Sequence, residues 1–138
     1  MHIDTALIAT TERLLAEAGR RGEEGLVLWL GNDDVPSQVY QPRIQAGPRH
    51  FRVVPDEQRR LIAHCSNQQV RLLAQVHSHP NAAFHSDVDN RDALVRRLGG
   101  LSIVLPRFAV EGFRAPDWKA YQLTDQGWRE VSRTVITW

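Results

Sequence analysis

Three short, largely apolar runs constrain the fold of this chain more than any other feature of its sequence. Residues 26–31 read LVLWLG, residues 70–76 read VRLLAQV, and residues 101–105 read LSIVL. Runs of this length, bounded by turn-forming residues, are typical of buried strands. Each buried strand needs neighbours and a covering layer, so we expect these three runs to be strands of one mixed sheet.

The segments between these runs predict the helices and the remaining strands. Apolar residues at helical intervals indicate helices over residues 3–19, from Pro55 to about Ser66, and from Ser86 to Leu98. Further strands are expected from Gln38 to Ile44, from Phe51 to Val54, and in a closing hairpin over residues 118–136. Because helices and strands are intermixed, the predicted fold class is α/β (α+β), a mixed sheet sandwiched by helices in a single domain over residues 1–138.

Charge and composition exclude several classes of function. The chain has 17 Lys and Arg against 16 Asp and Glu, and its arginine pairs are dispersed, so we expect no nucleic-acid partner. No apolar run reaches the roughly 20 residues that span a bilayer, so we expect no membrane association. Cys65 is the only cysteine, which excludes an internal disulfide and predicts a reducing, cytoplasmic location.

One short segment carries side chains suited to binding a metal. The strand over residues 70–76 leads directly into His77, and His79 follows two residues later. Side chains alternate along a strand, so the two imidazoles project from the same face about 6–7 Å apart. Pro80 then ends the strand, and Asp89 lies one turn into the next predicted helix. Two nitrogens and one carboxylate oxygen, with a fourth position left to water, form a catalytic zinc arrangement.

The helix start that carries the aspartate also has a purely structural interpretation. Ser86 and Asp89 match the Ser-x-x-Asp pattern of a capping box, which requires no metal. The two interpretations are compatible, because a capped first turn fixes the direction of the carboxylate. His85 and Asp87 are alternative ligands that the local sequence does not exclude.

The pattern His77-Ser78-His79-Pro80, followed after a short loop by Ser86-x-x-Asp89, resembles the signature of the JAB/JAMM (MPN) metalloproteases. That family implies a glutamate on an early strand, and Glu24 stands seven residues before Gly31 as the family pattern requires. Glu23 is the alternative, since neighbouring strand residues face opposite ways.

The chain departs from the family pattern at two points. Val27 stands where glycine is common in the glutamate strand. Six residues, rather than seven, separate His79 from Ser86, and surface loops absorb single deletions. The remaining elements follow the family order of helix, glutamate strand, motif, helix and strand.

The resemblance implies a cytidine-deaminase-like fold and a zinc-dependent peptidase or isopeptidase. His77, His79 and Asp89 would hold Zn²⁺, Glu24 would act as the general base, and Ser86 would donate to the oxyanion. The family also implies a ubiquitin-like protein or its conjugates as substrate, with E1-like and E2-like proteins as partners in a bacterial conjugation or antiphage defence operon. The alternatives are a zinc peptidase that processes a sulfur-carrier or other small precursor, and an inactive scaffold of the same fold.

Overall fold

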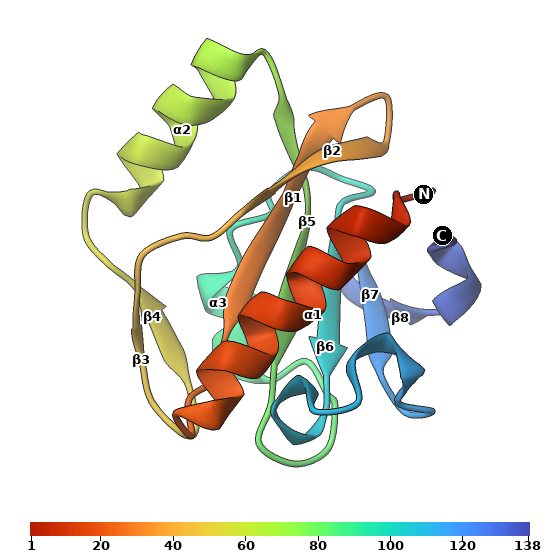
Figure 1. Cartoon of the computed structure of the whole chain (residues 1–138). Coiled ribbons are helices and arrows are strands. Elements are labelled where there is room, and N and C mark those ends of the chain that lie inside the picture. Colours follow the sequence, from red (N-terminus) through yellow and green to blue (C-terminus); the bar gives the residue numbers. More distant parts are fainter.

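A six-stranded mixed sheet in the order β2-β1-β5-β6-β7-β8 forms the centre of the molecule (Figure 1). The computed structural model describes residues 1–138. The strands are β1 (Leu26–Asn32), β2 (Val35–Tyr40), β5 (Arg71–Ser78), β6 (Leu101–Leu105), β7 (Lys119–Thr124) and β8 (Gly127–Val131). Only β5 and β6 are parallel; the other neighbours are antiparallel. The three apolar runs are therefore strands of one sheet, as predicted, and the structure shows that they are adjacent.

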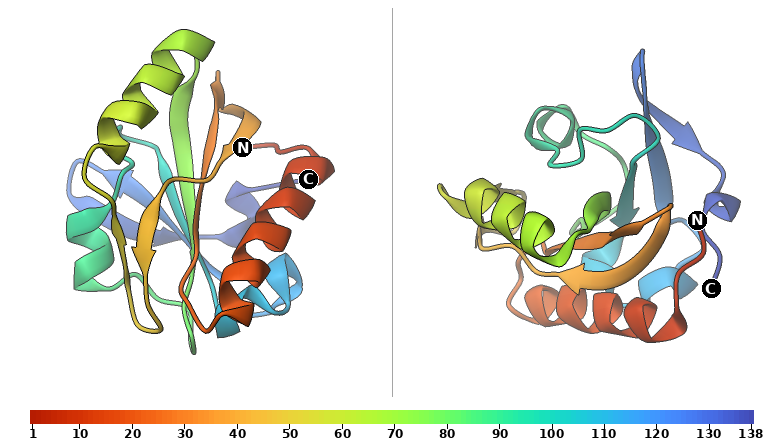
Figure 2. Two further views of the ribbon diagram at one scale, coloured as in Figure 1. Left: turned by 60° about the vertical axis from the view of Figure 1, so that its left-hand side comes forward. Right: turned by 90° about the horizontal axis from the view of Figure 1, so that it is seen from above.

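Helices cover both faces of this sheet (Figure 2). Helix α1 (Thr5–Arg20) packs on one face, and α2 (Glu57–Gln68) and α3 (Asp87–Asp92) lie on the other. A separate two-stranded sheet of β3 (Ile44–Ala46) and β4 (Phe51–Val53) stands beside the α2 and α3 face. The expected fold class, a mixed sheet sandwiched by helices, is confirmed. None of the helices combines the length and hydropathy that a membrane span requires.

Strand β1 shows why its sequence is apolar without alternation. Val27 and Trp29 belong to the larger core cluster, which includes Leu15 of α1. Leu28 and its neighbours two residues away belong to a second cluster on the opposite face. The indole Nε1 of Trp29 also donates to Thr11 Oγ1 over 2.9 Å, which satisfies both buried polar groups. Both faces of the strand are thus buried, and neither tolerates polar residues.

The third predicted helix, Ser86 to Leu98, is wrong in its second half. Helix α3 ends at Asp92, and Ala93 adopts an extended conformation. The backbone N–H groups of Leu94 and Val95 donate instead to Gln75 Oε1 on β5, over 2.9 and 3.3 Å. This long-range acceptor competes with the intrahelical carbonyls and ends the helix early.

Two predicted strand boundaries also differ in the structure. The strand expected from Gln38 to Ile44 is divided, because β2 ends at Tyr40 and β3 begins at Ile44. Pro42 lies in the gap, where it has no N–H to offer a ladder. The closing hairpin forms, but β8 ends at Val131, and Ser132 caps a 3₁₀ turn over Arg133–Val135.

Candidate metal centre

Two strand-end histidines and one helix aspartate converge on the α3 face of the sheet. One ligand atom from each of His77, His79 and Asp89 lies within 4.8 Å of the others. Asp89 Oδ2 is 3.4 Å from His77 Nε2 and 3.2 Å from His79 Nε2. The residues are 0%, 5% and 9% exposed, so bulk water does not satisfy their polar atoms. The structure therefore brings together all three ligands expected from the sequence.

The geometry of this cluster fits a zinc ion. A tetrahedral ion with bonds of about 2.0–2.1 Å holds its ligand atoms roughly 3.4 Å apart. The two contacts of Asp89 Oδ2 match that spacing. In addition, both ring nitrogens of His77 are buried without a hydrogen-bond partner. Buried imidazole nitrogens without partners are costly, and coordination of an ion by one of them relieves that cost.

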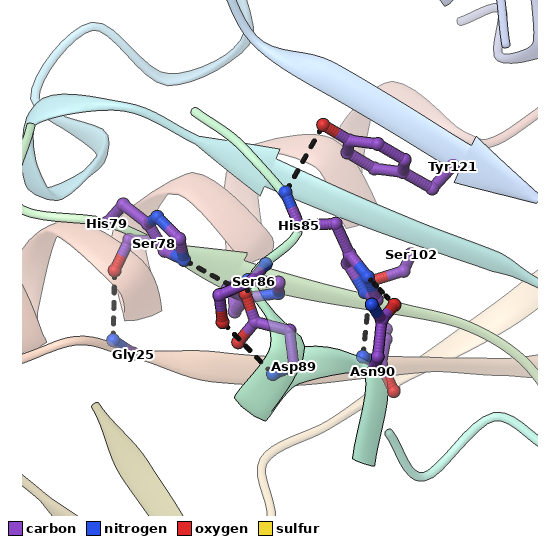
Figure 3. A network of polar contacts seen from close by, with 11 residues as sticks. Gly25, Ser78, His79, His85, Ser86, Asp89, Asn90, Ser102 and Tyr121 are labelled. Atoms are coloured by element: carbon purple, nitrogen blue, oxygen red, sulfur yellow. Dashed lines mark hydrogen bonds and ion pairs between the residues drawn. The ribbon is translucent and has the colours of Figure 1, made fainter. Parts of the chain in front are cut away.

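The capping box and the cluster share one carboxylate. Ser86 Oγ accepts from the Asp89 backbone N–H over 3.1 Å, and Ser86 N–H donates to Asp89 Oδ2 over 2.9 Å (Figure 3). The same Oδ2 faces both histidines. The capping box is present, and it is compatible with the metal-binding interpretation because the cap orients the carboxylate toward the histidines.

The charge states of the cluster are those that a metal ligand needs. Burial alone would raise the pKa of Asp89, but the His77 and His79 side chains beside it outweigh that effect and hold this pKa well below its ordinary value. Burial lowers the pKa of His77. At neutral pH the cluster is therefore an ionised carboxylate beside a neutral imidazole, and both bind metal without losing a proton first.

Glu24 lies just before β1 and lines the cleft beside the cluster. It is 3% exposed, and this burial raises its pKa to about 7, with His79 partly opposing the rise. Glu23 is half-exposed, does not line the cleft, and pairs with Arg21 over 3.2 Å. Of the two candidate glutamates, Glu24 is the one that lines the cleft, and its raised pKa suits it to exchange a proton near neutral pH.

A pair of hydrogen bonds fixes this glutamate relative to the histidines. Ser78 Oγ accepts from Gly25 N–H over 2.9 Å (Figure 3). Ser78 N–H in turn donates to Gly25 O over 3.1 Å. Glu24 N–H donates to Gly47 O, next to the β3–β4 turn, over 2.9 Å. Sequence reasoning missed Ser78, although its place between the two histidines was a usable signal.

The cluster opens into a cleft of about 620 Å³ between the β3–β4 hairpin and the segment over residues 79–92. Three aromatic residues that sequence reasoning missed border the site. Phe51 packs edge-on against His77 with ring centroids 5.7 Å apart, Phe84 packs against His79 at 4.7 Å, and Phe108 lines the cleft. Phe84 remains 52% exposed, so the cleft has an apolar rim open to a ligand.

The alternative ligands lie outside the cluster. Both ring nitrogens of His85 make other contacts, with Asn90 Oδ1 at 2.6 Å and Ser102 Oγ at 2.9 Å. Asp87 is exposed, and it is not among the grouped ligands.

A buried His-His-Asp cluster with a protonatable glutamate in the same cleft is the arrangement of a metal-dependent hydrolase. The family model for prokaryotic homologues of the JAB domain matches residues 8–123. The chain belongs to this JAB/JAMM metalloprotease family.

Individual relatives agree with this assignment. A protein of Sinorhizobium fredii described as a probable metalloprotease is 34% identical over 139 residues, covering 94% of this chain and 86% of its own length. A protein of Desulfitobacterium hafniense superimposes with a TM-score of 0.71 at 20% identity, over 99% of this chain and 90% of that one. A structure described as JAMM, a metalloprotease-like zinc site in the proteasome and signalosome, superimposes with a TM-score of 0.55 at 20% identity. The match covers 96% of this chain and 93% of that one. The two structural matches show a shared fold.

Proposed function

We propose that this protein is a zinc metallopeptidase that cleaves the peptide or isopeptide bond after the C-terminus of a ubiquitin-like protein. The observation that carries the proposal is the buried cluster of His77, His79 and Asp89, with Glu24 in the same cleft. The zinc site described for a structural neighbour supports the choice of metal. The three clustered residues would hold the ion.

Two side chains of this chain would handle the protons of the reaction. Zinc, when bound, supplies a Lewis acid and lowers the pKa of a coordinated water. Glu24, whose pKa lies at about 7, takes a proton from the attacking water and returns it to the leaving amine as the C–N bond breaks. Ser86 Oγ already accepts from Asp89 N–H, so its own proton is free for the oxyanion.

The substrate proposal rests on the family resemblance and on the form of the cleft. The β3–β4 sheet has only two strands, so each strand keeps an edge without a ladder partner in this sheet. An extended peptide can add to such an edge through main-chain hydrogen bonds. The C-terminal tail of a ubiquitin-like protein is extended and would reach Glu24 along this hairpin. E1-like and E2-like proteins of the same conjugation or defence system are the proposed partners.

A fusion of a ubiquitin-like protein to an unrelated reporter tests the proposal by mass spectrometry of the products. We expect zinc-dependent cleavage at the end of the tail, abolished in Glu24→Gln and retained in the matched control Glu23→Gln. Cutting of generic peptides, without need for the ubiquitin-like body, would instead indicate a precursor-processing peptidase. A zinc-loaded protein that cleaves no fusion and no peptide would be an inactive scaffold.

A further inference from the structure

The ring of His85 lies next to His77 of the ligand cluster, with ring centroids 6.1 Å apart, and both of its nitrogens have hydrogen-bond partners. Its Nδ1 is 2.6 Å from Asn90 Oδ1 on α3, and its Nε2 is 2.9 Å from Ser102 Oγ on β6 (Figure 3). Tyr121 and Trp128 pack against the ring, with centroids 5.0 Å from it. The ring thus bridges the central sheet and the short helix that carries Asp89.

The direction of these hydrogen bonds follows from Gln75. Its Oε1 accepts from two backbone N–H groups, so its amide nitrogen is the group that faces Ser102 Oγ, at 3.2 Å. Ser102 accepts this bond, and its single proton is left to donate to His85 Nε2. The proton of the imidazole then lies on Nδ1 and is donated to Asn90 Oδ1. The opposite tautomer would leave the hydroxyl proton of Ser102, which is fully buried, without a partner.

Helix α3 needs such an anchor because it has only six residues. Helices of that length are not stable by themselves. His85 directly precedes Ser86, so holding its ring also holds the start of the helix. The backbone N–H of His85 donates to Tyr121 OH on β7 over 3.2 Å. Ser86 N–H in turn holds Asp89 Oδ2, the oxygen that faces both histidines. A shift of the ring would therefore displace the cap and the carboxylate together.

We propose that Gln75, Ser102, His85 and Asn90 form a directed hydrogen-bond relay in which His85, held as its Nδ1–H tautomer, is a positioning residue for Ser86 and Asp89. The part of this inference that concerns zinc and turnover rests on the proposed function. The tautomer and the order of the α3 cap do not depend on it.

Asn90 is exposed, so its variants are suited to the test. In the ¹⁵N spectrum of the wild-type protein, with or without zinc, we expect a protonated Nδ1 and an unprotonated Nε2 at His85. Asn90→Ala should leave Nδ1 protonated, because Ser102 still donates to Nε2, but the ring loses its hydrogen bond to α3. Hydrogen exchange at the Asp89 amide should therefore become faster, and zinc binding and kcat should each fall by about 10-fold with KM unchanged. Asn90→Asp keeps an acceptor oxygen, so Nδ1 should stay protonated and zinc binding should be no weaker than in the wild type.

The matched control is Asn67→Ala, on the exposed side of α2, which should change none of these quantities. A protonated Nε2 with a bare Nδ1 in the wild type would overturn the relay. Unchanged amide exchange and zinc affinity in Asn90→Ala would overturn the positioning role. If the wild-type tautomer and the faster Asp89 amide exchange in Asn90→Ala are both observed while no fusion is cleaved, the relay is supported and the proposed function alone fails.

Discussion

The two faces of the central sheet are built on different principles. The face under α1 belongs to a cluster of 15 buried apolar residues, where the Trp29–Thr11 hydrogen bond satisfies the buried indole and hydroxyl. The other face has an apolar cluster of only five residues, and beside it lie buried Glu24, His77 and Asp89. One face supplies apolar burial. The other face buries fewer apolar side chains and holds polar groups whose partners are other side chains or an ion.

The largest effect on stability is expected on the α1 face. Leu15 is 0% exposed within the larger cluster, so Leu15→Ala should lower the free energy of unfolding by about 2–5 kcal/mol. Urea denaturation of the zinc-free protein measures it. Leu98→Ala, at a position 63% exposed, is the control and should change stability by less than about 0.5 kcal/mol. Equal losses in the two variants would contradict the assignment of the core.

On the site face, a substitution should stabilise the zinc-free protein. Burial raises the pKa of Glu24 from 4.5 to about 7, so the folded state binds this proton more tightly than the unfolded state. That contribution to stability is fully present below pH 4.5 and is lost as the pH rises through 7. Glu24→Gln keeps the shape without the charge, and should therefore be more stable than the wild type at pH 8 by up to about 3 kcal/mol.

The pH dependence of this difference is the decisive part of the measurement. At pH 4 the glutamate is mostly protonated in both states, so wild type and Glu24→Gln should unfold at nearly the same urea concentration. Glu23→Gln should differ little from the wild type at either pH, because that side chain is half-exposed. A Glu24→Gln variant that is no more stable than the wild type at pH 8 would show that the carboxylate is not desolvated.

A smaller effect on stability is expected at the contact between Ser78, which lies between the two histidines, and Gly25, which follows Glu24. Ser78→Ala removes the acceptor of the Gly25 N–H and leaves a buried donor without a partner. We expect a loss of about 1–3 kcal/mol in the free energy of unfolding, with a lower kcat because Glu24 is less well fixed. Ser66→Ala, on the exposed side of α2, is the control. Wild-type stability and kcat in Ser78→Ala would show that Glu24 is positioned by other contacts.

The features that the sequence predicted depend on residues close together in the chain, and those it missed depend on contacts between distant residues. The strands over residues 26–31 and 101–105 were predictable because a continuous apolar run needs no knowledge of its neighbours. The convergence of His77 and His79 followed from strand alternation alone. The end of α3 was not predictable, since it depends on Gln75 accepting from Leu94 and Val95 about 20 residues away.

Long-range contacts also decide the roles of residues within the site. Local alternation left Glu23 and Glu24 open, and only the folded structure shows that Glu24 is buried in the cleft while Glu23 pairs with Arg21. His85 remained an alternative ligand because its partners, Asn90 and Ser102, are brought to it by different elements. Nearest-neighbour patterns thus identify ligand types, and long-range hydrogen bonds decide which of them face the cleft.

The zinc content of purified variants tests the central claim most directly. Elemental analysis should find one zinc per chain in the wild type and in His64→Ala, whose half-buried histidine lies on α2 away from the cluster. His77→Ala should hold no stoichiometric zinc. Chelators lower the melting temperature by removing an ion that stabilises the folded state, so they should have no such effect on this variant. A full equivalent of zinc in His77→Ala would contradict the assignment of His77, His79 and Asp89 as the metal site.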